Sequence, residues 1–252
     1  MTSFLGRARD AMQIGELAVR ACELRETLGR RVIIGMAGPP GAGKSTFAEN
    51  LNRELGTSSA LLPMDGFHLS NEVLCSLGRE DRKGAPDTFD ISGYLTTLRR
   101  LKYQNETVFA PRFDRARDEA IGAAISIGPD VSIVITEGNY LLLDQPGWRD
   151  VHPLLDEAWW IHSDSSTRVR RLVARHQQFG RSLHDAERWV HRSDEANAEL
   201  VQNDQEKAQL IIANYGGSPA AKQQHLYIPS RTTRIAAITQ ASEPQTRRGR
   251  TQ

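Results

Sequence analysis

Cysteine, net charge and long apolar runs are all scarce in this sequence of 252 residues. Its two cysteines, Cys22 and Cys75, are too few for a disulfide framework and too isolated for a zinc site built on thiolates. Lysine and arginine total 32 against 31 aspartates and glutamates, so a formal charge of +1 provides no global field for nucleic acid or an anionic membrane. No stretch approaches the roughly 20 apolar residues of a spanning helix. These shortages predict a cytoplasmic protein that binds neither nucleic acid nor membrane.

Hydrophobic residues make up 39% of the chain and charged residues 25%, which suits one globular domain with tails. Apolar residues recur at helical spacing from about Asp10 to Leu28, so residues 1–30 should form an amphipathic helix that packs on the core. Residues 31–229 should form the main domain. Residues 230–252 are rich in Thr, Arg, Gln and Ser without periodicity, and we expect this tail to be disordered.

Short apolar runs alternate with helical segments through the main domain. This alternation indicates a mainly parallel sheet covered by helices on both faces, an α/β architecture of three layers. The predicted strands are Val32–Ala37, Ala60–Pro63, Val131–Thr136, Glu157–Ile161 and Gln209–Ala213, with a hairpin inserted at Val108–Phe113 and Ala120–Ile127. The predicted helices are Ser45–Leu55, Ser92–Tyr103, Ser166–Gln178 and His184–Val201.

A glycine-rich turn joins the first predicted strand to the next helix. Its sequence, GPPGAGKS, satisfies the pattern G-x-x-x-x-G-K-[ST] in the strand-to-helix context that makes the pattern specific. Lys44 should reach the β- and γ-phosphates of a nucleotide, and the Ser45 hydroxyl should ligate Mg²⁺. The alternative, a structural turn with an exposed lysine, is disfavoured by the complete motif. The predicted nucleotide-binding residues are Gly38, Gly41, Ala42, Gly43, Lys44, Ser45 and Thr46.

Two carboxylates follow predicted strands. Asp65 comes just after the second strand and Glu137 ends the strand that begins at Val131. Because parallel strands present their carboxyl ends at one sheet edge, both should lie beside the glycine-rich turn. There Asp65 could accept the proton of an attacking hydroxyl, and Glu137 could hold a water ligand of Mg²⁺. By residue type alone, Asp65 is typical of a turn or cap and Glu137 of a strand end facing water.

Four segments, GPPGAGKST, MDGFHLS, RKGAPDTFD and ITEGNYLLL, resemble in order and spacing the uridine kinase, pantothenate kinase and phosphoribulokinase branch of P-loop kinases. The likeness extends from about Arg31 to Ala213 and is greatest to bacterial nucleoside/nucleotide kinase family proteins, some labelled fructokinase. It implies a three-layer P-loop NTPase fold with a helical lid, ATP as donor, Mg²⁺, a hydroxyl acceptor and Asp65 as base. The acceptor, whether a nucleoside, a sugar or a pantothenate-like compound, stays open, as does the choice between monomer and homodimer.

Arg168, Arg171 and Arg175 fall on one face of a predicted helix. Such a face can bring guanidinium groups to the phosphates if the helix moves as a lid. The resemblance favours Arg171 and Arg175 for this catalytic role. Without the resemblance, a solvated basic face is an equally good interpretation. The nearby His176 and Arg181 receive no role.

The acceptor site should draw on residues 65–111, because the corresponding segments of similar kinases cover the carboxyl edge of the sheet. Asp87 can accept hydrogen bonds from sugar hydroxyls, Lys83 can approach an anionic group, and Phe89 can offer an apolar wall. Arg115, in APRFDRARD, resembles a further acceptor-side segment. A polar surface loop is the alternative for Lys83, Asp87 and Phe89.

A nucleotide-hydrolysing switch or chaperone that acts on a protein partner is the second functional hypothesis. The sequence has no N-K-x-D element that would read guanine after the glycine-rich turn. A kinase that acts on nucleic-acid ends would need a basic, aromatic groove, which the near-neutral charge disfavours. The sequence therefore favours a kinase for a small hydroxyl-bearing metabolite.

Overall fold

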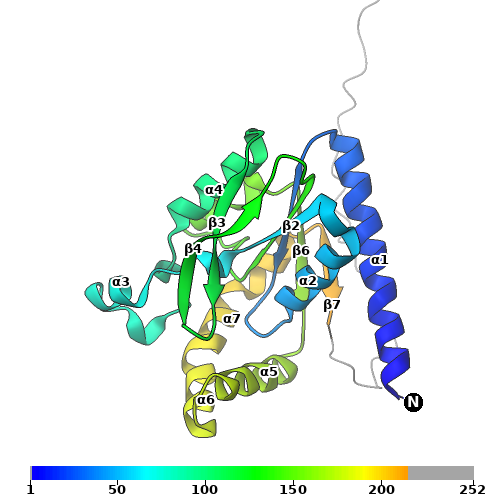
Figure 1. Cartoon of the computed structure of the whole chain (residues 1–252). Helices are drawn as coiled ribbons and strands as arrows, with labels where there is room; N and C mark the ends of the chain where they lie inside the picture. Colours follow the sequence, from blue (N-terminus) through cyan, green and yellow to red (C-terminus); the bar gives the residue numbers. More distant parts are fainter. Residues whose placement is uncertain (1, 215–252) are drawn as a thin grey trace, which may run out of the picture.

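The computed structural model describes residues 2–214, with side chains from residue 14 onward. At its centre, five parallel strands form a sheet in the order β2-β5-β1-β6-β7 (Figure 1). They are β1 (Val32–Ala37), β2 (Ser59–Pro63), β5 (Ile133–Gly138), β6 (Glu157–His162) and β7 (Leu210–Ala213). All five coincide closely with predicted strands. The tail predicted for residues 230–252 lies outside the described residues.

Helices cover both faces of this sheet. The helices of the described chain are α1 (Thr2–Leu28), α2 (Lys44–Leu55), α3 (Asn71–Ser76), α4 (Ile91–Tyr103), α5 (Ser165–Gln178), α6 (Leu183–Trp189) and α7 (Glu195–Val201), of which α1 and α2 cover one face and α4 the other. Ile34 of β1 packs in the core beneath α1 and α2, whereas Ile33 packs with α4 on the other face, because successive side chains of a strand point to opposite sides. The three-layer α/β/α architecture is therefore confirmed. None of the described helices is both long and apolar enough to cross a membrane.

Helix α1 runs alongside α2 at one side of the molecule (Figure 1). It spans most of the predicted residues 1–30, beginning at Thr2, ahead of the apolar periodicity that starts near Asp10, and ending before Gly29, which adopts a φ of 62°. Ile14, Leu17 and Ala21 of α1 are buried in the core that α1 shares with α2. The apolar stripe seen in the sequence therefore attaches this helix to the sheet layer.

Two further substructures lie over the carboxyl edge of the sheet. The antiparallel hairpin of β3 (Val108–Asp114) and β4 (Glu119–Ile127) is one of them, and its register shifts between Ala110 and Arg112. The other consists of α5, α6 and α7, of which α5 and α6 lie at the bottom of Figure 1. The helix predicted at His184–Val201 is divided, because residues Val190–Asp194 form a π-helical turn between α6 and α7.

Candidate active site

The glycine-rich loop between β1 and α2 is shaped by close contacts with its surroundings. Gly41 has a φ of 76°, and a Cβ atom there would come within 2.8 Å of the carbonyl oxygen of Arg168 on α5. Nδ2 of Asn214, just after β7, donates a hydrogen bond of 2.7 Å to the carbonyl oxygen of Ala42. Glycine is required at position 41 both for this backbone conformation and for the close approach of α5.

Lys44 is buried, with only 7% of its surface exposed. Its Nζ donates to the carbonyl oxygen of Pro39 at 3.1 Å and to Oδ1 of Asn139 at 2.7 Å. Burial lowers the pKa of Lys44 to about 8, although the carboxylates of Glu137 and Asp65 oppose this shift. The two oxygen acceptors compensate in part for the burial of this ammonium group.

Ser45 and Glu137 meet at the base of the cavity, where Oγ of Ser45 donates to Oε1 of Glu137 at 3.0 Å. Burial, together with the nearby charge of Asp65, raises the pKa of Glu137. A buried carboxylate beside a hydroxyl group, with a second carboxylate lining the same cavity, favours a bound cation. No group of three or more His, Cys, Asp and Glu side chains that could hold a metal occurs in the described part of the chain. This sparse oxygen donor set fits Mg²⁺, which keeps several waters and shares substrate phosphates.

Asp65 lies in a 3₁₀ turn that follows β2. Its Oδ2 accepts a hydrogen bond from Nη2 of Arg115 at 3.1 Å, and its carbonyl oxygen lies 2.7 Å from Nδ1 of His68. Burial alone would raise the pKa of Asp65, but His68, Arg115 and Arg175 together lower it below its ordinary value. Burial lowers the pKa of His68 itself, so Arg115, Arg175 and Lys44 are the positive charges that act on Asp65 at neutral pH.

The three arginines of α5 occupy different places. Arg168 is buried and donates to the carbonyl oxygen of Pro40 at 3.1 Å. Arg171 donates to the carbonyl oxygens of Gly41 and Ala42, both at 3.3 Å, and it does not line the cavity. Arg175 does line the cavity, and burial lowers its pKa. Of these three arginines, Arg175 is therefore the one that lines the cavity.

The cavity has a volume of about 450 Å³ and extends from the glycine-rich loop to the hairpin. Of the predicted nucleotide-binding residues, Gly41, Lys44 and Ser45 line it. The others contribute backbone to the turn or, like Thr46, face solvent. The predicted base, Asp65, and the predicted metal residue Glu137 also line this cavity. So do three of the predicted acceptor-side residues, Lys83, Phe89 and Arg115.

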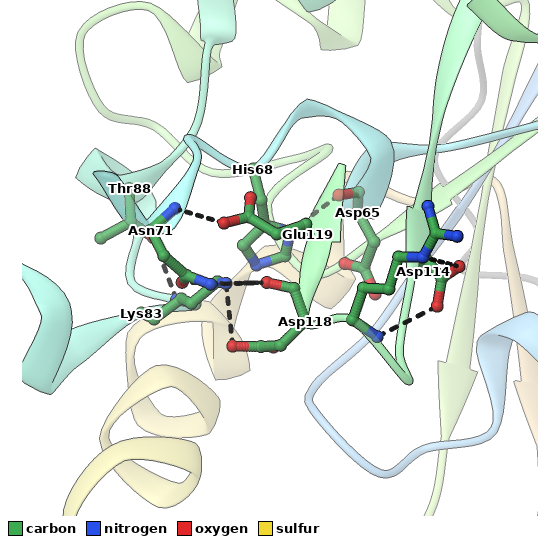
Figure 2. Close-up of polar contacts among 10 residues, drawn as sticks. Asp65, His68, Asn71, Lys83, Thr88, Asp114, Asp118 and Glu119 are labelled. Carbon is green, nitrogen blue, oxygen red and sulfur yellow. Dashed lines mark hydrogen bonds and ion pairs between the residues drawn. The ribbon is translucent and has the colours of Figure 1, made fainter. Parts of the chain in front are cut away.

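Lys83 fastens the acceptor side of the cavity to the hairpin (Figure 2). Its Nζ donates to Oδ1 of Asn71 at 2.6 Å and to both the carbonyl oxygen and Oδ2 of Asp118, at 2.5 and 2.9 Å. Oε1 of Glu119 in turn accepts from the backbone N–H of Asn71 at 2.9 Å. The turn of the hairpin is therefore tied to the beginning of α3.

Asp87 does not line the cavity. Its carboxylate pairs with Arg82 at 2.7 Å and with Arg79 at 3.4 Å, both on the chain just before it. Phe89 lies at the cavity wall, where the His68 ring packs against it with centroids 4.0 Å apart. The structure thus brings Phe89 to the site and turns Asp87 toward surface arginines.

Comparison with known proteins bears on this arrangement. The model of the Phosphoribulokinase / Uridine kinase family matches residues 33–218. The chain belongs to this family. The uncharacterised protein YggC of Escherichia coli is 34% identical over 188 residues, which are 73% of this chain and 78% of that protein. A Schizosaccharomyces pombe protein, provisionally named a uridine kinase, is 36% identical over 179 residues, 67% of this chain and 76% of its own.

Solved structures agree with membership in the phosphoribulokinase/uridine kinase family. A Silicibacter structure, provisionally described as a fructose transport system kinase, is 37% identical with a TM-score of 0.66, covering 73% of this chain and 93% of its own. D-glycerate 3-kinase from Cryptococcus neoformans shares the fold, with 14% identity and a TM-score of 0.63 over 81% of this chain and 95% of its own. Membership confirms the P-loop kinase fold and places the chain among ATP-dependent small-molecule kinases.

Several site residues of this family member were not found from the sequence. Asn139 follows Glu137 by two positions in ITEGNY, and its place just after a strand that ends at the same sheet edge could have indicated a site residue. Nε2 of His176 lies 2.9 Å from Oδ2 of Asp194, and Trp189 lines the cavity near this pair. Asp194 ends the π-helical turn, whose extra residue per turn leaves no simple periodic signal in the sequence.

Proposed function

We propose that this chain transfers the γ-phosphoryl group of ATP to a hydroxyl group of a small metabolite. The observation that carries the proposal is the convergence of Lys44, Asp65 and Arg175 on one cavity beside the glycine-rich loop. The lysine and arginine supply positive charge for a transferring phosphoryl group, and the ionised carboxylate can receive a proton from an acceptor. The same cavity continues past Asp65 to Lys83 and Phe113, which leaves space for an acceptor beside the carboxylate.

The donor half of the site would hold the phosphates. Backbone N–H groups of the loop, the N-terminus of α2 and the Lys44 ammonium group would bind the β- and γ-phosphates. Ser45 and Glu137 would hold Mg²⁺ through the hydroxyl oxygen and through water. When bound, Mg²⁺ would neutralise negative charge on the β- and γ-phosphate oxygens.

The acceptor half of the site would supply the base. As the acceptor oxygen forms its bond to the γ-phosphorus, the bond from that phosphorus to the β,γ-bridging oxygen breaks and ADP leaves. The hydroxyl proton passes to the carboxylate of Asp65, which the charge of Arg115 keeps ionised. Arg175 would stabilise negative charge on the phosphoryl oxygens during transfer.

Arg171 would act as a positioning residue. Its hydrogen bonds to Gly41 and Ala42 link α5 to the glycine-rich loop. A movement of α5 as a lid would therefore be transmitted to the loop that holds the phosphates. Arg175, one helical turn farther along α5, would move with it.

The direct test is a screen for ADP release by the purified protein with Mg²⁺ and ATP. The acceptors to be offered are nucleosides, sugars, pantothenate and sugar phosphates. ADP formation that requires one class of acceptor supports the kinase. ATP hydrolysis that proceeds at the same rate with and without an acceptor would instead support a nucleotide-dependent switch.

A further inference from the structure

Five lysine and arginine side chains line the active-site cavity, and most of them are already engaged. Lys83 has three acceptors for its three N–H hydrogens, so it has no donor left for a ligand. Lys44 donates within the phosphate-binding loop, and Arg115 is paired with Asp65. The five cationic side chains are Lys44, Lys83, Arg115, Arg175 and Arg181.

The carboxylates that line the same cavity also have partners. Asp65 accepts from Arg115, Asp118 from Lys83, and Glu137 from Ser45. Asp194 is paired with His176, and Glu80 accepts from its own backbone N–H and from Cys75. None of these five carboxylates is paired with Arg175 or Arg181.

Arg175 and Arg181 remain, with no hydrogen bond or ion pair from either side chain among residues 14–214. The charge of Arg175 acts on Lys44 and Asp65, which places it at the phosphate end of the cavity. Arg181 follows the turn at Gly180 after α5, and its guanidinium group lies against the indole of Trp189. The N–H donors of Arg181 are therefore available to a ligand other than the transferred phosphate.

Trp189 fixes the Arg181 guanidinium group and places it near the acceptor loop. Cζ of Arg181 lies 4.0 Å from the centroid of the Trp189 ring. A guanidinium group stacked on an aromatic face keeps the N–H donors of its edge available. Arg192, whose Cζ is 5.3 Å from the same ring, donates to the carbonyl oxygen of Asp81 at 2.9 Å. Since Asp81 lies two residues before Lys83, this connection joins the stack to the acceptor side.

The aromatic residues of the acceptor side offer little surface to a neutral base. Phe89 is 7% exposed, and its ring packs against His68, Tyr140 and Trp148. His68 also packs against Phe113, with centroids 4.7 Å apart. These rings contact one another, so an acceptor would meet mainly polar groups there.

We propose that Arg181, held on Trp189, binds an anionic group of the acceptor, so that the acceptor is a hydroxyl compound that carries a carboxylate or a phosphate. This inference rests on the proposed kinase function. Arg181 is a specificity-determining residue at the end of the acceptor opposite the reacting hydroxyl. A guanidinium fork pre-oriented on an indole suits the two oxygens of a carboxylate or phosphate.

The experiment compares acceptors in matched neutral and anionic pairs, with wild-type full-length protein and the variant R181M. The pairs are glycerol and glycerate, panthenol and pantothenate, ribose and ribose 5-phosphate, and uridine and uridine 5′-monophosphate. Wild-type protein should prefer the anionic member of the pair that it phosphorylates. Whether that pair carries a carboxylate or a phosphate shows which of the two anions the site binds. In R181M the KM for that anionic acceptor should rise about 10- to 100-fold, with the KM for ATP within about twofold.

Two further variants control for charge and geometry. R188M removes an exposed arginine of α6 that pairs with Asp185 and does not line the cavity, so its KM values should stay unchanged. R181K keeps the charge but loses the planar fork, and it should recover only part of the affinity for the anionic acceptor. Preference for the neutral member would overturn the inference. An equal rise in both KM values would assign Arg181 to the nucleotide.

A binding measurement separates this inference from the proposed function. If no acceptor of either class is phosphorylated, the kinase proposal fails, and calorimetry with protein saturated by Mg²⁺ and a non-hydrolysable ATP analogue decides about Arg181. Binding of an anionic compound by wild type and its loss in R181M would support the anion site. Absence of binding by every anionic compound of the panel would overturn it.

Discussion

Nη2 of Arg115 lies 3.1 Å from Oδ2 of Asp65, so a guanidinium group from the hairpin holds the carboxylate that follows β2. The two residues are fifty positions apart in the sequence. The contact joins the acceptor-side hairpin to the sheet edge that carries the phosphate loop. The ionisation of the proposed base therefore depends on the position of the hairpin.

Arg115→Met should move the acid limb of the pH–rate profile to higher pH. The carboxylate of Asp65 acts as a base only when ionised, and the charge of Arg115 helps to lower its pKa. Removal of that charge raises the pKa of Asp65, so activity is lost at a higher pH as the pH falls. The measurement is kcat against pH, with Arg117→Met, an exposed change on the same hairpin, as control. An acid limb at the same pH in Arg115→Met and wild type would show that the group that titrates there is not Asp65.

Asp65→Asn should bind Mg-ATP normally and turn over poorly. Loss of a positioned base typically lowers kcat by about 10²- to 10⁴-fold. The loop, Lys44 and the proposed metal residues remain, so nucleotide binding should persist. Calorimetry measures ATP affinity, and steady-state kinetics measure kcat. If the variant lost ATP affinity but kept kcat at saturation, Asp65 would belong to the metal site instead.

Glu137→Gln should raise the Mg²⁺ concentration that gives half-maximal rate. Its carboxylate is buried beside Ser45, and the amide that replaces it lacks the charge that attracts the ion and its waters. The measurement is rate against Mg²⁺ concentration at saturating ATP. Glu106→Gln, which alters a surface pair with Arg100, serves as the matched control. An unchanged Mg²⁺ dependence with a reduced kcat would contradict the metal role.

Lys44→Met should abolish turnover and stabilise the protein without nucleotide. The pKa of Lys44 is about 8 in the folded protein against an ordinary 10.5, so the unfolded chain binds more protons between these values. The stability of the wild type should therefore rise as pH increases from about 8 to 10.5, while below pH 8 the buried ammonium group costs stability. At pH 7 the variant should melt a few degrees higher. A lower melting temperature, measured calorimetrically, would show that the hydrogen bonds of Lys44 outweigh its burial.

The sequence indicated those parts of the site that depend on local pattern. The turn before Lys44 and the carboxylates after two strands were predictable because parallel strands end at a common edge. The family resemblance then pointed to the segment around Lys83 and to the arginines of α5. The sheet and its covering helices followed from the alternation of apolar runs and helical periodicity.

Contacts between distant segments could not be predicted in this way. The carboxylate of Asp87 pairs with Arg79 and Arg82. Nothing in the sequence of this segment distinguishes such an ion pair from a hydrogen bond to a substrate hydroxyl. Arg171 donates a hydrogen bond to the glycine-rich loop without lining the cavity. This contact depends on the close approach of α5 to Gly41. The stack of Arg181 on Trp189 brings the loop between α5 and α6 against the end of α6, and the loop has no periodic signature in the sequence.

The most direct test of the kinase proposal is the stoichiometry of products in the presence of an acceptor that stimulates ADP release. Phosphorylated acceptor, ADP and inorganic phosphate would be quantified by ³¹P NMR for wild type and Asp65→Asn. We predict one phosphorylated acceptor for each ADP, almost no inorganic phosphate, and loss of both products in the variant. Release of inorganic phosphate in step with ADP, without a phosphorylated acceptor, would contradict phosphoryl transfer to a small molecule.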